Sequence, residues 1–362
     1  MCYSSRGVAE RIVWPICAAF ASLSGCLGSP LSGESALSDA EVAGSRDAAG
    51  GTPTGATNEN PDRMPTDQPA APAEPVDPTD LSTLQVFPQD NPWNQDISAL
   101  ALHPSSDAIL ASIGLDTGLH PDFGTVWEGA PIGIPFVVVR DRQPRVPVSF
   151  YYEDESDPGP YPIPSDAPIE GGADSDGDRH VLVVDVDNKL LYETFDSHPQ
   201  PDGSWEAGSG AVFDLTSNEL RPAGWTSADA AGLPIFAGLV RYDEVVERGE
   251  ITHALRFTVR NSRRAYIPPA THFASSDPSP DLPPMGLRVR LRADFDSSGF
   301  TPNVQVILRA MKTYGMFVAD NGSDWYVSGA PDPRWDDDEL RQLRQVKGRD
   351  FEVVYTGEPV TD

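Results

Sequence analysis

Residues 180–195, HVLVVDVDNKLLYETF, are the stretch that decides the fold class of this chain. Two runs of strand-forming residues, rich in Val, Leu, Tyr and Phe, flank the turn-forming pair Asp187-Asn188. β-Branched and aromatic side chains favour strands, and Asp and Asn favour the tight turn between them. The stretch therefore predicts a β-hairpin.

Strand signals continue on both sides of this hairpin. Further runs begin at Gly133, Val146, Gly210, Ile251, Gly286, Phe317 and Trp325. Three segments, 104–114, 302–314 and 336–346, have the apolar spacing or end signals of helices. Many short strands with long Pro- and Gly-rich loops indicate a mainly β fold, with a sandwich- or jelly-roll-like core and a few peripheral α-helices. We expect residues 83–357 to form a single large β-rich domain.

The N-terminal region carries an export signal. Arg6 and Arg11 precede the apolar run 12–23, which is too short to span a bilayer as a helix. The run ends in Leu23-Ser24-Gly25-Cys26, which resembles the lipobox of bacterial lipoproteins. The resemblance implies that residues 1–25 are a lipoprotein signal peptide and that Cys26 is lipidated. The protein would then be exported and anchored to the cell envelope, at the outer membrane if the host has one. An ordinary secretory signal with a chance cysteine is the alternative.

Residues 26–82 have the composition of a tether. Pro, Ala, Gly, Ser, Thr, Asp and Glu dominate this segment, which offers little apolar surface to bury. Such a composition cannot offset the entropy lost on ordering. We expect a disordered, lipid-anchored linker.

Charge and cysteine content narrow the classes of function. The formal net charge of -29 argues against nucleic-acid binding, which depends on neutralising phosphates with Lys and Arg. The three cysteines, Cys2, Cys17 and Cys26, all precede the predicted domain, so that domain contains no disulfide or thiolate site. We expect a monomer whose stability comes from burial.

The stretch 225–256, with its flanks, concentrates residues that could carry chemistry. A histidine beside carboxylates can act as a general acid or base because its pKa is near neutral. We expect His253 or His272 in that role, with Asp229 or Glu244 as the carboxylate partner. Substrate binding is expected from Trp225, Arg256, His180 and Trp325. In a regular strand from Ile251, His253 and Arg256 would face opposite sides.

Other patterns suggest alternative chemistry. A carboxylate pair for glycoside hydrolysis could come from Glu193, Asp214, Asp229 and Glu244. The stripe Arg288, Arg290 and Arg292 could bind a uronate for β-elimination, or could be a solvated strand face. Asp174, Asp176 and Asp178 resemble the start of a calcium loop and could hold a structural calcium, although the distal Glu of an EF-hand is missing; a turn of good loop formers is the alternative. His180, His253 and His272 could form a three-histidine metal site. Tryptophans on loops could stack against sugars or fill the core.

Several pieces of the folded region carry a family resemblance. They are Asp90-Asn-Pro-Trp-Asn, Arg179-His-Val-Leu, the ten residues from Trp225, His253-Ala-Leu-Arg-Phe-Thr and Ala319-Asp-Asn-Gly-Ser-Asp-Trp. Together they resemble a family of secreted bacterial proteins of uncharacterised activity. The resemblance implies export, but it transfers no reaction.

These observations favour a carbohydrate-active enzyme, either a glycoside hydrolase or a polysaccharide lyase, in the cell envelope. The alternative is a non-catalytic glycan- or envelope-binding lipoprotein, which would keep an aromatic groove without an acid–base pair. A structural surface protein with neither groove nor site is the third reading.

Overall fold

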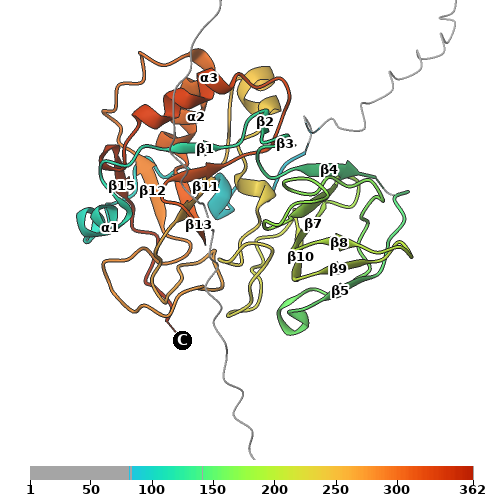
Figure 1. Ribbon diagram of the computed structural model, residues 1–362. Coiled ribbons are helices and arrows are strands. Elements are labelled where there is room, and N and C mark those ends of the chain that lie inside the picture. Colours follow the sequence, from blue (N-terminus) through green and yellow to red (C-terminus); the bar gives the residue numbers. More distant parts are fainter. Residues whose placement is uncertain (1–80, 82–83, 141, 362) are drawn as a thin grey trace, which may run out of the picture. The chain divides into compact units, whose positions relative to one another are not determined.

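A computed structural model describes residues 81, 84–140 and 142–361 of the chain (Figure 1). The predicted signal peptide 1–25 and Cys26 lie outside the described residues, as does the predicted linker 26–82 apart from Leu81. Within the described part, fifteen strands form four sheets, so the predicted mainly β fold is confirmed.

A six-stranded sheet forms the larger half of the architecture. In sheet order, its strands are β1 (His120–Asp122), β14 (Tyr326–Ser328), β11 (Leu255–Val259), β13 (Met316–Asn321), β12 (Arg288–Leu291) and β15 (Phe351–Val353). The pairs β1–β14 and β11–β13 are parallel, and the others are antiparallel.

A four-stranded sheet forms the other half. In sheet order, its strands are β10 (Ser209–Asp214), β7 (Leu190–Phe195), β6 (Val181–Asp185) and β4 (Phe136–Val139). The predicted hairpin is confirmed as β6 and β7, but its connection is four residues long, with Lys189 at φ 56°. β6 is buried along its whole length, which accounts for its nearly continuous apolar sequence.

Two small sheets complete the set. β5 (Val148–Phe150), β9 (Trp205–Ala207) and β8 (His198–Pro199) form one, and β2 (Val126–Trp127) with β3 (Ala130–Pro131) forms a short hairpin. The pairs β4–β6 and β5–β9 are parallel. A jelly roll is built from antiparallel strands, so these parallel pairs do not confirm that part of the prediction.

Three α-helices accompany the sheets in the described part. α1 (Ser106–Ile113) and α2 (Pro302–Thr313) confirm two predicted helices, and Gly315 at φ 68° follows α2. The third prediction, 336–346, was too long: α3 (Asp337–Leu340) continues only as the 3₁₀ turn η5 (Arg341–Gln345). The remaining 3₁₀ segments are η1 (Pro92–Asn94), η2 (Glu153–Glu155), η3 (Phe236–Gly238) and η6 (Gly348–Asp350), and η4 (Asp243–Arg248) is a π-helix.

One hydrophobic core joins the two large sheets. It includes Leu182 and Leu191 of the four-stranded sheet together with Phe257 and Val318 of the six-stranded sheet. A second, smaller cluster, which contains Val183 and Tyr192, covers the opposite face of the four-stranded sheet. Among the described residues, none of the helices has the length and apolar character that crossing a membrane requires.

Candidate active site

The turn Ser227–Ala231 is held by three of the residues predicted to be functional. His180 Nε2 lies 3.0 Å from the Ala228 carbonyl oxygen, and His272 Nδ1 lies 2.7 Å from that of Ala230. Between them, Arg256 donates from Nε and Nη2 to Asp229 Oδ2, at 3.2 and 2.9 Å. Histidines and an arginine far apart in the sequence therefore meet on one turn.

Local interactions fix this turn between the two large sheets. The carboxylate of Glu193 on β7 is fully buried and accepts the backbone N–H groups of Ile235 and Phe236, each at 2.8 Å. Ser227 Oγ donates to the Leu233 carbonyl at 2.7 Å. The segment 227–236 is thus bound to β7 at its C-terminal end, and at its N-terminal end Ser227 folds it back onto Leu233.

Strand register places Asp122 and Ser328 beside Arg256. Asp122 lies opposite Ser328 in the parallel pair β1–β14. Arg256 on the next strand, β11, donates from Nη1 to Ser328 Oγ at 2.7 Å. A register shift between β11 and β13 then pairs Thr258 with Asp320. These side chains come from four neighbouring strands of one sheet.

Glu170 and His180 form an ion pair at the edge of the same group. His180 Nδ1 lies 2.6 Å from Glu170 Oε2. Because both ring nitrogens of His180 face acceptors, both contacts are hydrogen bonds only when the ring carries two protons. Burial alone would lower the pKa of His180, but Glu170 and Asp178 raise it to about 9. Burial likewise opposes ionisation of Glu170, yet His180 holds the pKa of Glu170 below its usual value.

The carboxyl groups near His180 and Arg256 have pKa values that differ widely from one another. Asp122 is exposed to solvent on one side, but crowding by the protein on the others, together with the charge of Glu170, raises its pKa to about 6. Burial and the charge of Asp229 raise the pKa of Asp320 to about 7. Glu170 therefore ionises at a lower pH than Asp122 and Asp320, which lose their protons only near pH 6 and pH 7.

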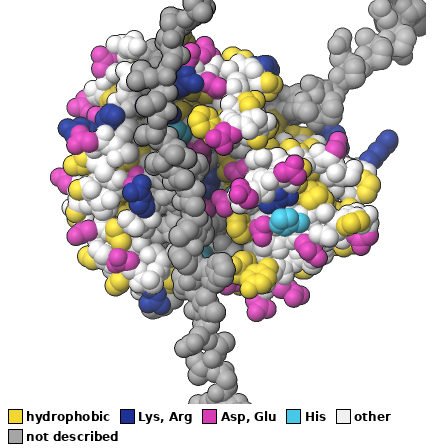
Figure 2. Space-filling model, viewed as in Figure 1, with side chains coloured by type: hydrophobic (Ala, Val, Ile, Leu, Met, Phe, Trp, Pro, Cys, Tyr) yellow, Lys and Arg dark blue, Asp and Glu magenta, His cyan; other side chains and the backbone are white. Residues whose placement is uncertain are grey.

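We call Asp122, Glu170, Asp178 and Asp320, with His180, Asp229 and Arg256 beneath them, the carboxylate cluster. Asp122 and Asp178 are exposed, Glu170 and Asp320 are half-buried, and the other three are buried. Figure 2 shows acidic side chains spread widely over the viewed face and far fewer basic ones, as the net charge of -29 requires. Groups of neighbouring carboxyl groups with perturbed pKa values are candidate functional sites.

His253 and Glu244 belong to a different network. His253 Nε2 lies 3.1 Å from Glu244 Oε2, and Arg241 Nη2 lies 2.6 Å from Glu244 Oε1. All three side chains are buried, and Glu244 is the second residue of the π-helix η4. Burial opposes ionisation of Glu244, but Arg241 and His253 lower its pKa. The strand predicted from Ile251 begins only at Leu255, so His253 precedes it and the alternation argument did not apply.

The predicted aromatic residues take different positions. Trp325 is fully buried, stacks between Phe257 and Phe351, and donates from Nε1 to the Gly114 carbonyl at 3.1 Å. It is a core residue and does not present a face for substrate. Trp225 is half-buried with the Arg221 guanidinium 5.6 Å from its ring centre. Of the six tryptophans in the described part, Trp127, on the β2–β3 hairpin, is the one that is widely exposed, at 65%.

The fold places the three aspartates of the predicted calcium loop in different surroundings. Asp174 and Asp176 are exposed on the surface, whereas Asp178 contributes to the field around His180. Within residues 81, 84–140 and 142–361, no three His, Cys, Asp or Glu side chains are arranged to hold a metal ion. In this part of the structure Asp174, Asp176 and Asp178 are not gathered as metal ligands.

The arginine stripe fastens the N-terminal part of the domain to the six-stranded sheet. Arg288 donates to the carbonyls of Pro92, Gln95 and Tyr314, and Arg290 pairs with Glu352 and with carbonyls between residues 97 and 100. Arg292 alone is substantially exposed. Arg288 is buried and Arg290 is half-buried, and both are bound to the chain itself, so neither is available to bind a uronate.

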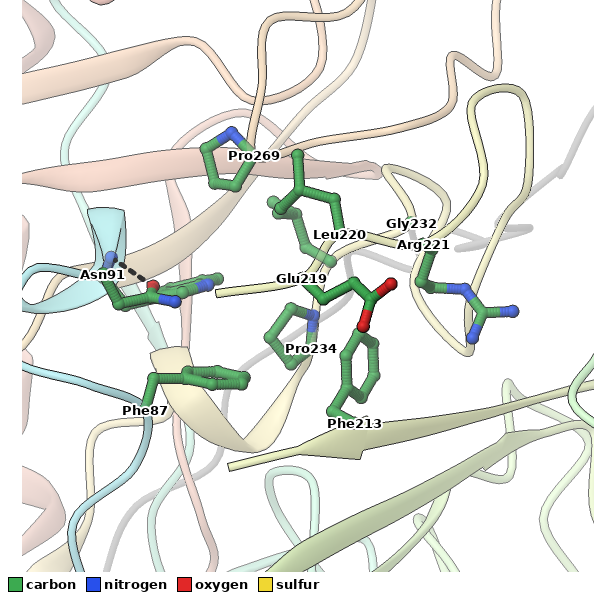
Figure 3. Close-up of a pocket in the computed structure, with 11 residues that line it drawn as sticks. Phe87, Asn91, Phe213, Glu219, Leu220, Arg221, Gly232, Pro234 and Pro269 are labelled. Atoms are coloured by element: carbon green, nitrogen blue, oxygen red, sulfur yellow. Dashed lines mark hydrogen bonds between the residues drawn. The ribbon is translucent and has the colours of Figure 1, made fainter. Parts of the chain in front are cut away.

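A small cavity lies beside Trp93, and Figure 3 shows its lining. Asn91, whose Oδ1 accepts the Trp93 backbone N–H at 3.0 Å, forms one side, and Phe213 and Pro234 contribute to the rest. Its volume of about 30 Å³ holds about one water molecule. This cavity cannot accommodate a sugar ring.

The structure thus brings together His180, His272, Asp229 and Arg256, and it separates them from His253, Glu244 and Trp325. Sequence reasoning missed Asp122, Glu170 and Asp320 as members of the site. Asp320 lies within Ala319-Asp-Asn-Gly-Ser-Asp-Trp and Asp122 within His120-Pro-Asp-Phe-Gly, so the local signal was an aspartate at the end of a strand, next to loop-forming residues. Comparison with protein-family models, curated proteins and solved structures gives no match to this chain.

Proposed function

We propose that the carboxylate cluster is the acid–base centre of an envelope hydrolase that acts on glycans. The observation that carries the proposal is the divergence of two neighbouring carboxyl groups, Asp122 with its pKa raised to about 6 and Glu170 with its pKa lowered. Glycoside hydrolysis needs one protonated and one ionised carboxyl group on either side of the scissile bond.

Asp122 is the proton donor in this proposal. It is exposed, so a bound substrate can reach it, and its raised pKa keeps a proton available to the departing oxygen. Asp320, with its pKa at about 7, is a second store of protons in the same cluster.

Glu170 is the ionised partner. Its ion pair with His180 keeps it charged, so that it can activate a water molecule or attack the sugar directly. His180, Asp229 and Arg256 are positioning residues, because they are buried and bind one another or the 227–231 turn.

Hydrolysis is preferred to β-elimination on a specific ground. Elimination from a uronate calls for cations that meet the substrate carboxylate, but Arg256 is bound to Asp229 and Ser328, and Arg288 and Arg290 are bound to the chain itself. The cluster offers carboxyl groups to the substrate instead.

The test is the full chain incubated with a panel of neutral and acidic polysaccharides, followed by reducing ends and by the absorbance of unsaturated uronates. We expect new reducing ends without unsaturated product. Asp122→Asn and Glu170→Gln should each lower kcat/KM by about 10²–10⁴-fold, the usual contribution of general acid–base groups. Asp176→Asn, an exposed neighbour, is the matched control and should change nothing.

The pH profile supplies a second readout. Asp122 must be protonated, so the rate should fall as pH rises through about 6, and Glu170 must be ionised, so the rate should fall only below its usual value of 4.5. Unchanged hydrolysis by Asp122→Asn would reject Asp122 as the proton donor and the carboxylate cluster as the catalytic site. Glycan retention without any cleavage would replace the hydrolase with the non-catalytic binding protein.

A further inference from the structure

A second cavity, larger than the one beside Trp93, is lined mainly by apolar side chains. It is a cavity open to solvent, with a volume of about 680 Å³, between residues 125–136, 167–173 and 330–333, and five of its lining residues are prolines. Thr125 and Asp332 are the only lining residues with a hydroxyl or charged side chain, and both are used within the protein. Thr125 Oγ1 donates to Asp337, and Asp332 accepts from Arg334 Nε and Nη2 at 2.8 and 2.7 Å. Its occupant must therefore be apolar where it meets these walls.

The cavity adjoins the carboxylate cluster through three chain segments. Glu170 lies between the lining residues Ile169 and Gly171, Asp122 precedes the lining residue Thr125 by three positions, and Ser328 precedes the lining residue Ala330 by two. A molecule that occupies the cavity and reaches out of it along these segments meets Asp122 and Glu170.

Charge further restricts the kind of molecule that this cavity can bind. The neighbouring carboxylates would repel an anion, and the cavity walls supply no cation to offset that repulsion. A volume of about 680 Å³ lies within the range of small-molecule sites, about 300–1,000 Å³. An uncharged ring with an apolar body satisfies both conditions.

We propose that this cavity is a binding subsite for an uncharged aryl or alkyl ring group on the substrate, next to the bond that the carboxylate cluster cleaves. The position of the ring relative to the cleaved bond rests on the proposed hydrolase function. The binding of the ring does not rest on it.

The binding test uses N-phenyl-1-naphthylamine, a neutral dye whose fluorescence rises in apolar surroundings, titrated into the full chain. We expect saturable binding that Ala173→Trp weakens at least tenfold, because the new ring would fill the cavity at an exposed lining position. Pro168→Asp, also at an exposed lining position, is the second variant and should act the same way through charge. Tyr151→Ala is the control. It removes an aromatic ring that is 83% exposed and does not line the cavity, so it should leave the dye affinity unchanged.

The link to the carboxylate cluster is tested with thioglycosides, which resist hydrolysis. They are added as competitive inhibitors while the protein cleaves whichever glycoside proves to be its substrate. A phenyl thioglycoside should inhibit about tenfold more tightly than its methyl counterpart, and Ala173→Trp should remove that difference. Dye binding without any hydrolysis would keep the apolar subsite and reject the hydrolase. Hydrolysis without saturable dye binding, or with equal inhibition by the two thioglycosides, would overturn the subsite and leave the hydrolase standing.

Discussion

His180 shows how one residue can define the state of its neighbours. It is buried, both of its ring nitrogens face acceptors, and it connects Glu170 to the turn that carries Asp229. In the sequence, Arg179-His180 before a strand marked a candidate, but its partner Glu170 lies in a long Pro- and Gly-rich loop with many acids. Which acid such a loop brings to a histidine depends on the path of the loop, and local pattern does not encode that path.

The ion pair of His180 and Glu170 predicts a pH-dependent stability. The pKa of His180 is raised from 6.5 to about 9, so its stabilisation is fully present below pH 6.5 and is lost as pH rises through 9. Glu170 has a lowered pKa, so its share is present above pH 4.5 and is lost at lower pH. We expect His180→Gln to reduce the free energy of unfolding most between pH 4.5 and 6.5, by about 1.5–3 kcal/mol for a charged hydrogen bond.

Urea denaturation of both proteins between pH 4 and 9.5 measures this difference. His198→Gln is the matched control, because His198 pairs with Asp196 at an exposed site and should show only a small effect. A difference between wild type and His180→Gln that stays constant over the whole range would refute the charged pair.

At the scale of the element, the arginine stripe on β12 illustrates what an alternating pattern leaves open. The sequence placed Arg288, Arg290 and Arg292 on one face of a strand, and that placement agrees with their shared contacts along the 92–100 segment and Glu352. It could not distinguish a solvated face from a covered one, because the covering segment lies nearly two hundred residues earlier in the chain.

The covering role predicts a large effect on stability. Arg288→Met would leave the carbonyls of Pro92, Gln95 and Tyr314 without this donor. Since each unsatisfied buried group costs about 1–3 kcal/mol, we expect the free energy of unfolding to fall by about 3 kcal/mol or more. Arg292→Met, at the exposed end of the same stripe, should change it by no more than about 0.5 kcal/mol. Equal effects of the two substitutions in chemical denaturation would contradict the role of Arg288 in holding the 92–100 segment to the sheet.

Elements with strong local signals were predictable, and their ends were not. The hairpin of β6 and β7 and the helices α1 and α2 follow from apolar spacing and from turn or stop residues. β11 begins four residues later than predicted, because His253 and Ala254 are committed to other contacts: His253 to Glu244, and the Ala254 N–H to the Trp93 carbonyl. His253 therefore belongs to the Glu244 network and not to the site that Arg256 occupies.

At the scale of the whole molecule, the predicted lipid anchor sets where a hydrolase would work. Cys26 lies outside the described residues, so the proposal rests on the lipobox resemblance of Leu23-Ser24-Gly25-Cys26. We expect the protein in a bacterial host to fractionate with membranes and to incorporate labelled palmitate, since two or more acyl chains give stable anchoring. Cys26→Ala should abolish the labelling, whereas Cys17→Ala should leave it unchanged. Labelling that survives Cys26→Ala would reject the anchor.

The proposed hydrolase depends on widely separated pKa values of neighbouring carboxyl groups in one cluster. A ¹³C NMR titration of the side-chain carboxyl groups tests it without knowledge of the substrate, with signals assigned through Asp122→Asn, Asp320→Asn and Glu170→Gln. We predict that Asp122 titrates near pH 6, Asp320 near pH 7 and Glu170 below 4.5. If instead the two aspartates titrate near 3.8 and Glu170 near 4.5, the cluster has no acid–base division and the proposed hydrolase loses its basis.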